Sequence, residues 1–173
     1  MDLKKEIREI QDYPKVGINF KDITTLAKNA KAFKYVVDQI EQNFKDKGIT
    51  KVVALEARGF IFGGAVADRL DAGFVPVRKK DKLPAEIISE SYALEYGEDR
   101  IEMHVDALSE NDVVLIHDDL LATGGTALAA LNMVKKCGVK SIFLSFVCDL
   151  EFIDTAIKRE LDQYEKQVLV KYI

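Results

Sequence analysis

The segment from Val113 to Ala127 constrains the fold of this chain more than any other part of the sequence. It reads V-V-L-I-H-D-D-L-L-A-T-G-G-T-A, an apolar run that stops at two adjacent carboxylates and is followed by a turn with two glycines. Apolar residues then recur at helical spacing from Leu128 onward. A short apolar run is typical of a buried strand, and a strand that turns directly into a helix is typical of an α/β sheet.

The turn has the properties of a phosphate-binding loop. Gly124 and Gly125 can adopt backbone angles that other residues avoid, and they let a ligand approach the main chain. The first amides of the following helix have no partner within it and carry the positive end of its dipole. Thr123 and Thr126 add hydroxyl donors. We therefore expect an anion at the start of this helix, and an ordinary tight turn is the alternative.

Two acids, Asp118 and Asp119, stand directly before this turn. They would repel a phosphate, so we expect them to contact sugar hydroxyls or a divalent cation that neutralises the phosphates. Consecutive strand residues point to opposite faces, so both acids can serve one ligand only where the strand ends, and we expect it to end there. The acids and the loop together predict a ribose phosphate site, although two such acids could also be simple turn formers.

Strands and helices alternate along the rest of the sequence. We expect a short N-terminal helix around Leu3, Ile7 and Ile10, and a helix from Ala32 to Phe44. The other expected strands are 51–55, 74–77, 113–116, 141–147 and 168–172, the other expected helices are 61–70, 127–137 and 152–161, and two extended arms lie over 87–104. This order predicts an α/β fold, with a mostly parallel sheet flanked by helices on both faces and ligands at the carboxyl ends of its strands.

Length and composition narrow the class of protein. A chain of 173 residues with 48% hydrophobic and 31% charged residues suits one globular domain over residues 1–173. The net charge of −4 argues against a general nucleic-acid binder. We find no signal peptide or long apolar span, and Cys137 and Cys148 lack metal-ligand spacing. We expect a cytoplasmic protein with free thiols and no membrane partner.

Five ordered segments carry a family resemblance. D-D-L-L-A-T-G-G-T, from Asp118 to Thr126, resembles the phosphoribosyl-pyrophosphate (PRPP) signature of type I phosphoribosyltransferases, in the form found in their adenine-specific members. Four more segments are similar to that family, in the right order and spacing: P-K-V-G-I-N-F-K-D-I-T-T-L at 14–26, E-A-R-G-F-I-F-G at 56–63, R-K-K-D-K-L-P at 78–84 and Y-A-L-E-Y-G at 92–97. Five segments are far more specific than one glycine turn.

The resemblance implies an activity and an organisation. The adenine-specific members transfer the phosphoribosyl group of PRPP to adenine, giving AMP and pyrophosphate in purine salvage, with Mg²⁺ as cofactor, and the resemblance implies this activity here. It further implies a small N-terminal hood over roughly residues 1–30, a flexible catalytic loop over roughly 84–100, and a homodimer in which one lysine of the 79–82 cluster reaches the partner's site. The rivals are transfer to another nucleobase, a PRPP-binding regulator without catalysis, and a phosphorylatable receiver domain.

The resemblance also assigns roles to residues. It implies that Glu95 handles the purine proton, that Tyr96 belongs to the lid, and that Phe20 and Leu120 form the apolar faces around the base, with backbone groups near Asn19 and Lys21 at its edge. Pyrophosphate would be held by Arg58, Arg78, Lys79 and Lys82, and the 5′-phosphate by Ala122, Thr123, Gly124, Gly125 and Thr126. Asp118 and Asp119 would bind the ribose hydroxyls, directly or through Mg²⁺.

Four residues depart from the family pattern, and one of them, Lys21, stands where arginine is also common. Val16 and Asn19 replace a more usual proline and aliphatic residue, which bears on the shape of the base pocket. His117 replaces a valine or isoleucine in the expected central strand. A polar ring at a buried position must find a partner, so we expect His117, like His104, to be structural rather than catalytic.

Overall fold

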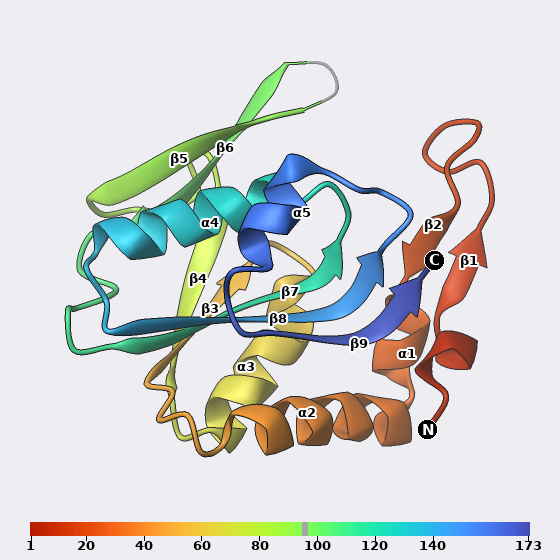
Figure 1. Cartoon of the computed structure of the whole chain (residues 1–173), viewed down its shortest axis with the longest axis horizontal. Coiled ribbons are helices and arrows are strands. Elements are labelled where there is room, and N and C mark those ends of the chain that lie inside the picture. Colours follow the sequence, from red (N-terminus) through yellow and green to blue (C-terminus); the bar gives the residue numbers. More distant parts are fainter. Residues whose placement is uncertain (95–96) are drawn as a thin grey trace.

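The apolar runs of the sequence pair into one seven-stranded sheet in the computed structural model, which describes residues 1–94 and 97–173 (Figure 1). Its strands lie in the order β5 (Ile87–Ala93), β6 (Glu98–His104), β4 (Gly73–Lys79), β3 (Lys51–Leu55), β7 (Val113–Leu121), β8 (Ser141–Leu150) and β9 (Lys166–Tyr172). The five strands from β4 to β9 are parallel to their neighbours, and the β5–β6 hairpin adds to β4 in antiparallel register. The predicted α/β class with a mostly parallel sheet is confirmed.

Helices cover both faces of this sheet, as predicted. In Figure 1, α2 (Ala30–Phe44) and α3 (Gly59–Arg69) lie below the sheet, and α4 (Gly125–Lys136) and α5 (Ala156–Leu161) lie above it. Asn29 caps α2, because its side chain accepts hydrogen bonds from two amides of the first turn. The buried stripe of α2 includes Val36, Ile40 and Phe44, each of which contributes about 1.5–3 kcal/mol by burial.

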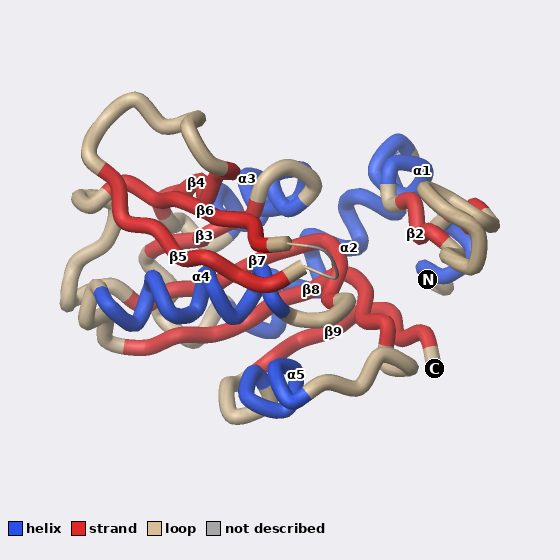
Figure 2. The backbone as a smooth tube through the Cα atoms, turned by 90° about the horizontal axis from the view of Figure 1, so that it is seen from above, coloured by secondary structure: helices blue, strands red, loops and turns tan. Residues whose placement is uncertain are grey.

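A separate two-stranded sheet forms the predicted hood. β1 (Arg8–Ile10) pairs antiparallel with β2 (Phe20–Asp22), and α1 (Thr24–Lys28) leads on to α2. Both views place this small layer beyond the carboxyl ends of the parallel strands, close to the end of β9 (Figures 1 and 2). We therefore expect a ligand to bind at the carboxyl ends of the strands, on the side that faces the hood.

Several predicted boundaries are wrong. The N-terminal helix is a single 3₁₀ turn, Leu3–Glu6, and the chain then enters β1, because the hood pairs this segment with β2. The central strand does not end at the acids: β7 continues to Leu121, because β8 extends beside it as far as the pair Leu121–Asp149. The last helix, expected from 152, begins only at Ala156 after an exposed Phe152.

The two extended arms predicted over 87–104 are the strands β5 and β6. Their mobility stays a prediction. Gly138, two residues beyond the end of α4, has a left-handed φ of +69°, as is common after a helix. In the part of the chain that the structure describes, no helix is long and apolar enough to span a membrane.

His117 lies at the centre of the sheet with no exposed surface. Its Nδ1 is 3.3 Å from the hydroxyl oxygen of Ser145 on β8, which confirms a partner for one ring nitrogen, whereas Nε2 has none among the described residues. Burial lowers the pKa of His117 to about 4, so the ring is neutral near pH 7. The ring packs toward α3 at Gly63, and we infer a structural role for it.

Candidate active site

The glycine turn joins β7 to α4 as a compact loop. Gly124 has a φ of +91°, which only glycine adopts readily, and α4 begins at the next residue. A small cavity of about 80 Å³ lies against this loop and the start of the helix, and it is lined by Asp118, Leu120, Leu121, Ala122, Thr123, Gly124, Gly125, Thr126 and Ala127. Backbone amides and threonine hydroxyls therefore converge on one anion-sized space.

The two acids lie inside β7 rather than at its end. Asp118 lines the loop cavity, whereas Asp119 lies beside Arg58. Both carboxylates nevertheless lie against the start of α3, at Gly59 and Arg58 respectively, so one ligand could still contact both. The prediction that both acids lie where the strand ends is wrong. One bond links them, since the Asp119 amide donates to Asp118 Oδ1 at 2.8 Å. The start of α3 packs so closely here that a Cβ on Gly59 would lie 3.0 Å from that oxygen.

Burial makes this pair costly to ionise. It raises the pKa of Asp118 well above its usual range, and the negative charge of Asp119 adds to the effect. Burial also raises the pKa of Asp119, while the Arg58 guanidinium opposes that change. Asp119 Oδ2 lies 3.0 Å from Arg58 Nε, yet within the described residues it accepts no hydrogen bond of good geometry. A ligand cation or hydroxyl donors would stabilise the charged form of the pair.

Arg58 joins the acid pair to the hood. It lies three residues beyond the end of β3 and directly before α3, after a cis peptide bond between Glu56 and Ala57. Its guanidinium carbon lies 5.1 Å from the centre of the Phe20 ring, within cation–π range. Arg58 thus contacts both an acid of the central strand and an aromatic residue of the hood, as a residue at the centre of the site would.

The basic cluster gathers around Glu56, whose carboxylate was not singled out from the sequence. It accepts hydrogen bonds from Arg78 Nε at 3.1 Å, from the Lys79 amide at 2.7 Å and from Lys82 Nζ at 2.7 Å. Burial alone would raise the pKa of Glu56, but these donors lower it to about 2. Arg78 and Lys79 belong to β4, which runs to Lys79 rather than ending at 77 as expected.

The side chain of Lys79 turns toward the hairpin. Its ammonium contacts the carboxylate of Asp99 on β6 and the hydroxyl of Tyr92 on β5. Tyr92 also packs on the first residue of α4, where a Cβ on Gly125 would lie 3.4 Å from its ring. The hairpin is therefore held between the basic cluster and the phosphate loop. Glu95 and Tyr96, predicted to act on the purine, lie outside the described residues.

A larger cavity of about 650 Å³ opens between the hood and the strand ends. Phe20 and Leu120, predicted to enclose the base, both line it, together with Gly17, Ile18, Asn19, Lys21, Ala122, Leu150, Phe152, Ile153, Tyr172 and Ile173. The lining is mainly apolar, as a flat aromatic ligand requires. Its size and position beside the loop cavity fit a base joined to a sugar phosphate.

The polar residues of the hood bind one another. Lys21 Nζ lies 2.8 Å from a carboxylate oxygen of Glu9 and 4.3 Å from the centre of the Tyr172 ring. Asn19 donates to the same carboxylate at 2.6 Å. Tyr172, at the end of β9, was not predicted as a site residue, and no local motif marks it. It joins the sheet to the hood, since Lys4 also lies 5.0 Å from its ring centre.

Comparisons with known proteins agree with this geometry. The model of the phosphoribosyl transferase domain matches residues 21–171. An adenine phosphoribosyltransferase of Phocaeicola vulgatus is 57% identical over 148 residues, which cover 86% of this chain and 85% of that relative. The chain belongs to the adenine phosphoribosyltransferases.

Solved adenine phosphoribosyltransferases share the whole fold. That of Thermoanaerobacter pseudethanolicus has a TM-score of 0.91 at 46% identity, with 99% of this chain and 98% of that chain covered. That of Giardia lamblia, solved in complex with 9-deazaadenine, has a TM-score of 0.91 at 36% identity, with 98% and 96% covered. The chain is accordingly an enzyme of the pentosyltransferase class with a type I phosphoribosyltransferase fold.

Proposed function

We propose that this enzyme transfers the phosphoribosyl group of PRPP to adenine, forming AMP and pyrophosphate, with the residues of the two cavities in distinct roles. The observation that supports this most directly is the adjacency of the cavities: Leu120 and Ala122 line both the loop cavity and the hood cavity. A phosphate in one and a base in the other would place a ribose beside the acid pair.

The 5′-phosphate would lie in the loop cavity, where amides of the first turn of α4 and the hydroxyls of Thr123 and Thr126 donate to it. The ribose hydroxyls would lie against Asp118 and Asp119. These carboxylates would also favour the positive charge that grows on the sugar as its bond to pyrophosphate breaks. Burial raises the pKa of each acid, and hydroxyl donors that bind the carboxylates would favour their ionised forms and lower the pKa again.

The reaction itself needs no covalent intermediate with the enzyme. N9 of adenine forms a bond to C1′ of the ribose while the bond from C1′ to the pyrophosphate oxygen breaks, and the N9 proton leaves to Glu95. The departing pyrophosphate would be bound by Arg58, Arg78 and Lys82. Arginine guanidinium groups donate paired hydrogen bonds to phosphate oxygens, and the lysine ammonium adds a compact positive charge. Phe20 and Leu120 would hold the base in line with C1′.

Mg²⁺ fits the donor set as an ion that arrives with PRPP. Asp118 lines the loop cavity, Asp119 lies beside Arg58, and Mg²⁺ in phosphate sites takes one or two carboxylates plus substrate oxygens. No group of three or more metal-ligating side chains occurs among residues 1–94 and 97–173, so we propose no ion held by protein alone. When bound, Mg²⁺ would neutralise charge on the pyrophosphate.

We further propose a cytoplasmic homodimer in which a lysine of the 79–82 cluster reaches the partner's site. The family resemblance supports this, and the exposed ring of Phe74, which packs on Phe60, is a candidate interface residue. Sedimentation of the purified enzyme tests the dimer, and a monomer at micromolar concentration would exclude it.

A substrate panel tests the reaction. Purified enzyme is incubated with PRPP, Mg²⁺ and adenine, hypoxanthine, guanine or orotate in turn, and the nucleotide product is measured. We expect AMP from adenine and at least about 100-fold lower kcat/KM for the other bases, because a site built on specific hydrogen bonds rejects bases that leave them unpaired. PRPP binding without any nucleotide product would favour the regulator instead.

Two variants test the assigned roles. Asp119→Asn should lower kcat by about 100-fold or more without unfolding the enzyme, because it removes charge that favours the cationic sugar. Glu95→Ala should leave PRPP binding intact and slow the single-turnover rate by about 100-fold or more, the usual contribution of a general base. Unchanged rates in either variant would remove that residue from the mechanism.

A further inference from the structure

The phosphate loop rests on α5, a short helix that no motif of the sequence marks. The hydroxyl of Thr155, the residue before α5, donates to the Thr123 carbonyl at 2.8 Å. The same hydroxyl accepts a hydrogen bond from the Lys158 amide at 3.1 Å and so caps α5. One side chain therefore joins the start of α5 to the backbone of the loop.

Side chains of α5 also pack on the loop glycine. A Cβ on Gly124 would lie 2.9 Å from a methyl carbon of Ile157, and 3.4 Å from carbons of Leu161 and Lys158. One face of α5 thus packs against the loop at Gly124. Movement of that helix by even a fraction of an ångström would change the space available to the loop.

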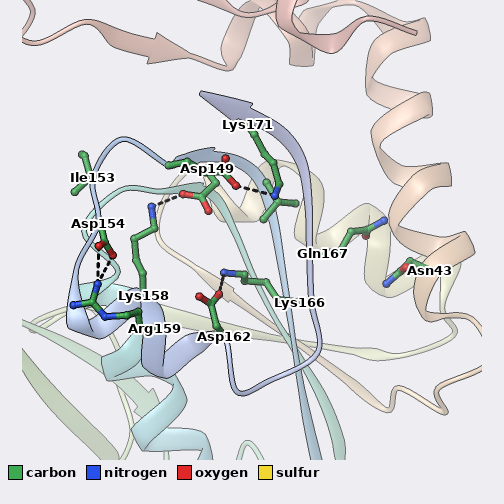
Figure 3. Close-up of a pocket in the computed structure, with 12 residues that line it drawn as sticks. Asn43, Asp149, Ile153, Asp154, Lys158, Arg159, Asp162, Lys166, Gln167 and Lys171 are labelled. Atoms are coloured by element: carbon green, nitrogen blue, oxygen red, sulfur yellow. Dashed lines mark hydrogen bonds and ion pairs between the residues drawn. The ribbon is translucent and has the colours of Figure 1, made fainter. Parts of the chain in front are cut away.

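A buried ion pair fixes α5 to the sheet. Lys158 Nζ donates to Asp149 Oδ1 at 2.5 Å (Figure 3). It also donates to the Leu150 carbonyl at 2.8 Å. Lys158 is 7% exposed and Asp149 is 4% exposed. Asp149 lies in β8 between Leu121 of β7 and Lys171 of β9, so the pair ties α5 to the strand beside the one that carries Asp118 and Asp119. Breaking a buried pair by removing one partner is strongly destabilising.

Among the described residues that line the surrounding groove of about 600 Å³, each charged side chain is paired with one of opposite charge. Its other described cations are also paired with carboxylates: Arg159 with Asp154, Lys166 with Asp162, and Lys171 with Glu151 (Figure 3). A groove neutralised in this way is a poor anion site. Its charges are better explained as the means by which α5 and β9 are held together.

We propose that Thr155 and Lys158 are positioning residues that hold the phosphate loop in the geometry that binds the 5′-phosphate of PRPP. This inference rests on the proposed function, because it assigns the loop to PRPP. Neither residue touches the substrate in this account. Thr155 acts through the Thr123 carbonyl, and Lys158 acts by anchoring α5 beneath Gly124.

Steady-state kinetics of Thr155→Val test the proposal. We expect KM for PRPP to rise about 3- to 10-fold, the range for loss of one hydrogen bond, while KM for adenine stays within about 2-fold. Thr155→Ser, which keeps the hydroxyl, should restore the wild-type KM. Arg159→Ala is the matched control on the same helix, since its partner is the exposed Asp154 rather than the loop, and it should change neither KM.

Lys158→Met and the double variant Lys158→Met with Asp149→Asn test the anchor. The single change leaves a buried carboxylate unpaired, so it should raise KM for PRPP and lower Tm, and the double change should recover part of both losses. If Lys158→Met does not fold, Thr155→Val alone decides. A Thr155→Val enzyme with unchanged KM for PRPP, or with both KM values raised alike, overturns the proposal.

Hydrogen exchange separates this inference from the proposed function. The amides of residues 122–126 should exchange several-fold faster in Thr155→Val than in the wild type, whether or not the enzyme makes AMP. If the wild-type enzyme forms no AMP, the proposed reaction is wrong. The exchange rates would still show whether Thr155 and Lys158 hold the loop in place. Equal exchange in the wild type, Thr155→Val and Lys158→Met would show that α5 does not hold the loop.

Discussion

The two sides of the proposed active site, the phosphate side at the start of α4 and the base side at the hood, are built in opposite ways. The phosphate side is one contiguous stretch, 118–127, in which a strand, a turn and the first turn of a helix supply nearly every group. The base side is assembled from distant parts of the chain: the hood at 17–21, the end of β7, the segment 150–153 and the end of β9. The first is set mainly by local backbone geometry, with α5 packed against it, and the second by contacts between elements far apart in sequence.

This difference should decide how each side tolerates change. On the phosphate side, a backbone angle and a close approach leave little freedom, because Gly124 has a positive φ and Ile157 lies beneath it. On the base side, the hood is a two-stranded sheet that meets the main sheet through a few side chains, among them Tyr172 and Arg58. Such small layers depend on packing against a larger body. We therefore expect large, local effects on one side and smaller, distributed effects on the other.

The largest effect is expected for Gly124→Ala. The new methyl group would meet Ile157 at 2.9 Å in a backbone conformation that alanine disfavours, so the loop must shift. A displacement of about 1 Å can cost about 100-fold, and we expect at least that loss in kcat/KM for PRPP. Gly138→Ala is the control, since Gly138 also has a positive φ but open space around it. Equal losses of kcat/KM in the two variants would show that the close contact at Gly124 is not what limits the loop.

A smaller effect is expected for Phe20→Ala on the base side. Stacking of an aromatic ring on a base contributes about 1–3 kcal/mol, so KM for adenine should rise by roughly 10-fold or more. KM for PRPP should change less. Phe20→Tyr keeps the ring and should remain near the wild type. A larger rise for PRPP than for adenine would place the base outside the hood cavity.

Tyr172→Leu should have a weaker effect of the same kind. Its ring lies over the ammonium groups of Lys4 and Lys21, and each such contact is typically worth about 0.5–1 kcal/mol. Losing both should loosen the hood and raise KM for adenine by about 3- to 10-fold, with kcat little changed. Tyr172→Phe retains the ring, and the Tyr172 hydroxyl accepts or donates no bond among the described residues, so that variant should match the wild type. Equal adenine KM values in Leu and Phe variants would remove Tyr172 from hood placement.

The smallest effect is a gain in stability. Burial raises the pKa of Asp118, so its ionised form destabilises the fold, and this cost is present at neutral pH and lost as pH falls through the raised pKa toward 3.8. Asp118→Asn should therefore raise Tm near pH 7, by roughly 2–4 °C for about 1 kcal/mol, while lowering activity. Calorimetry at pH 7.5 and pH 4.5 checks this, and the gain should shrink at the lower pH. A lower Tm at pH 7.5 would contradict the account.

The same contrast explains what the sequence could predict. The phosphate loop, the acid pair and the start of α4 were predictable because strand, turn and helix signals are local and adjoin one another. The helix from Ala30 to Phe44 was predictable for a similar reason, since its apolar stripe repeats at helical spacing. Phe20 and Leu120 could be assigned to one cavity only through the family resemblance, because nothing local joins them.

The failures have physical causes too. β1 and β2 have three residues each, too few to show an alternating pattern. β7 continues through Asp118 and Asp119 because pairing with β8 outweighs the low strand preference of two acids. Glu56 and Tyr172 were missed because their importance lies in tertiary partners, the basic cluster and the hood lysines, which no spacing in the sequence records.

The carboxylate of Glu56 bears on how quickly the enzyme can turn over. With a pKa of about 2 it stays ionised across the physiological range, and it engages Arg78, Lys82 and the Lys79 amide. An anion that binds these cations must compete with the Glu56 carboxylate. When the anion dissociates, the Glu56 carboxylate can pair with the cations again. Glu56 would thus lower the affinity of these cations for the product pyrophosphate and speed its dissociation. Product release would then not have to be the rate-limiting step.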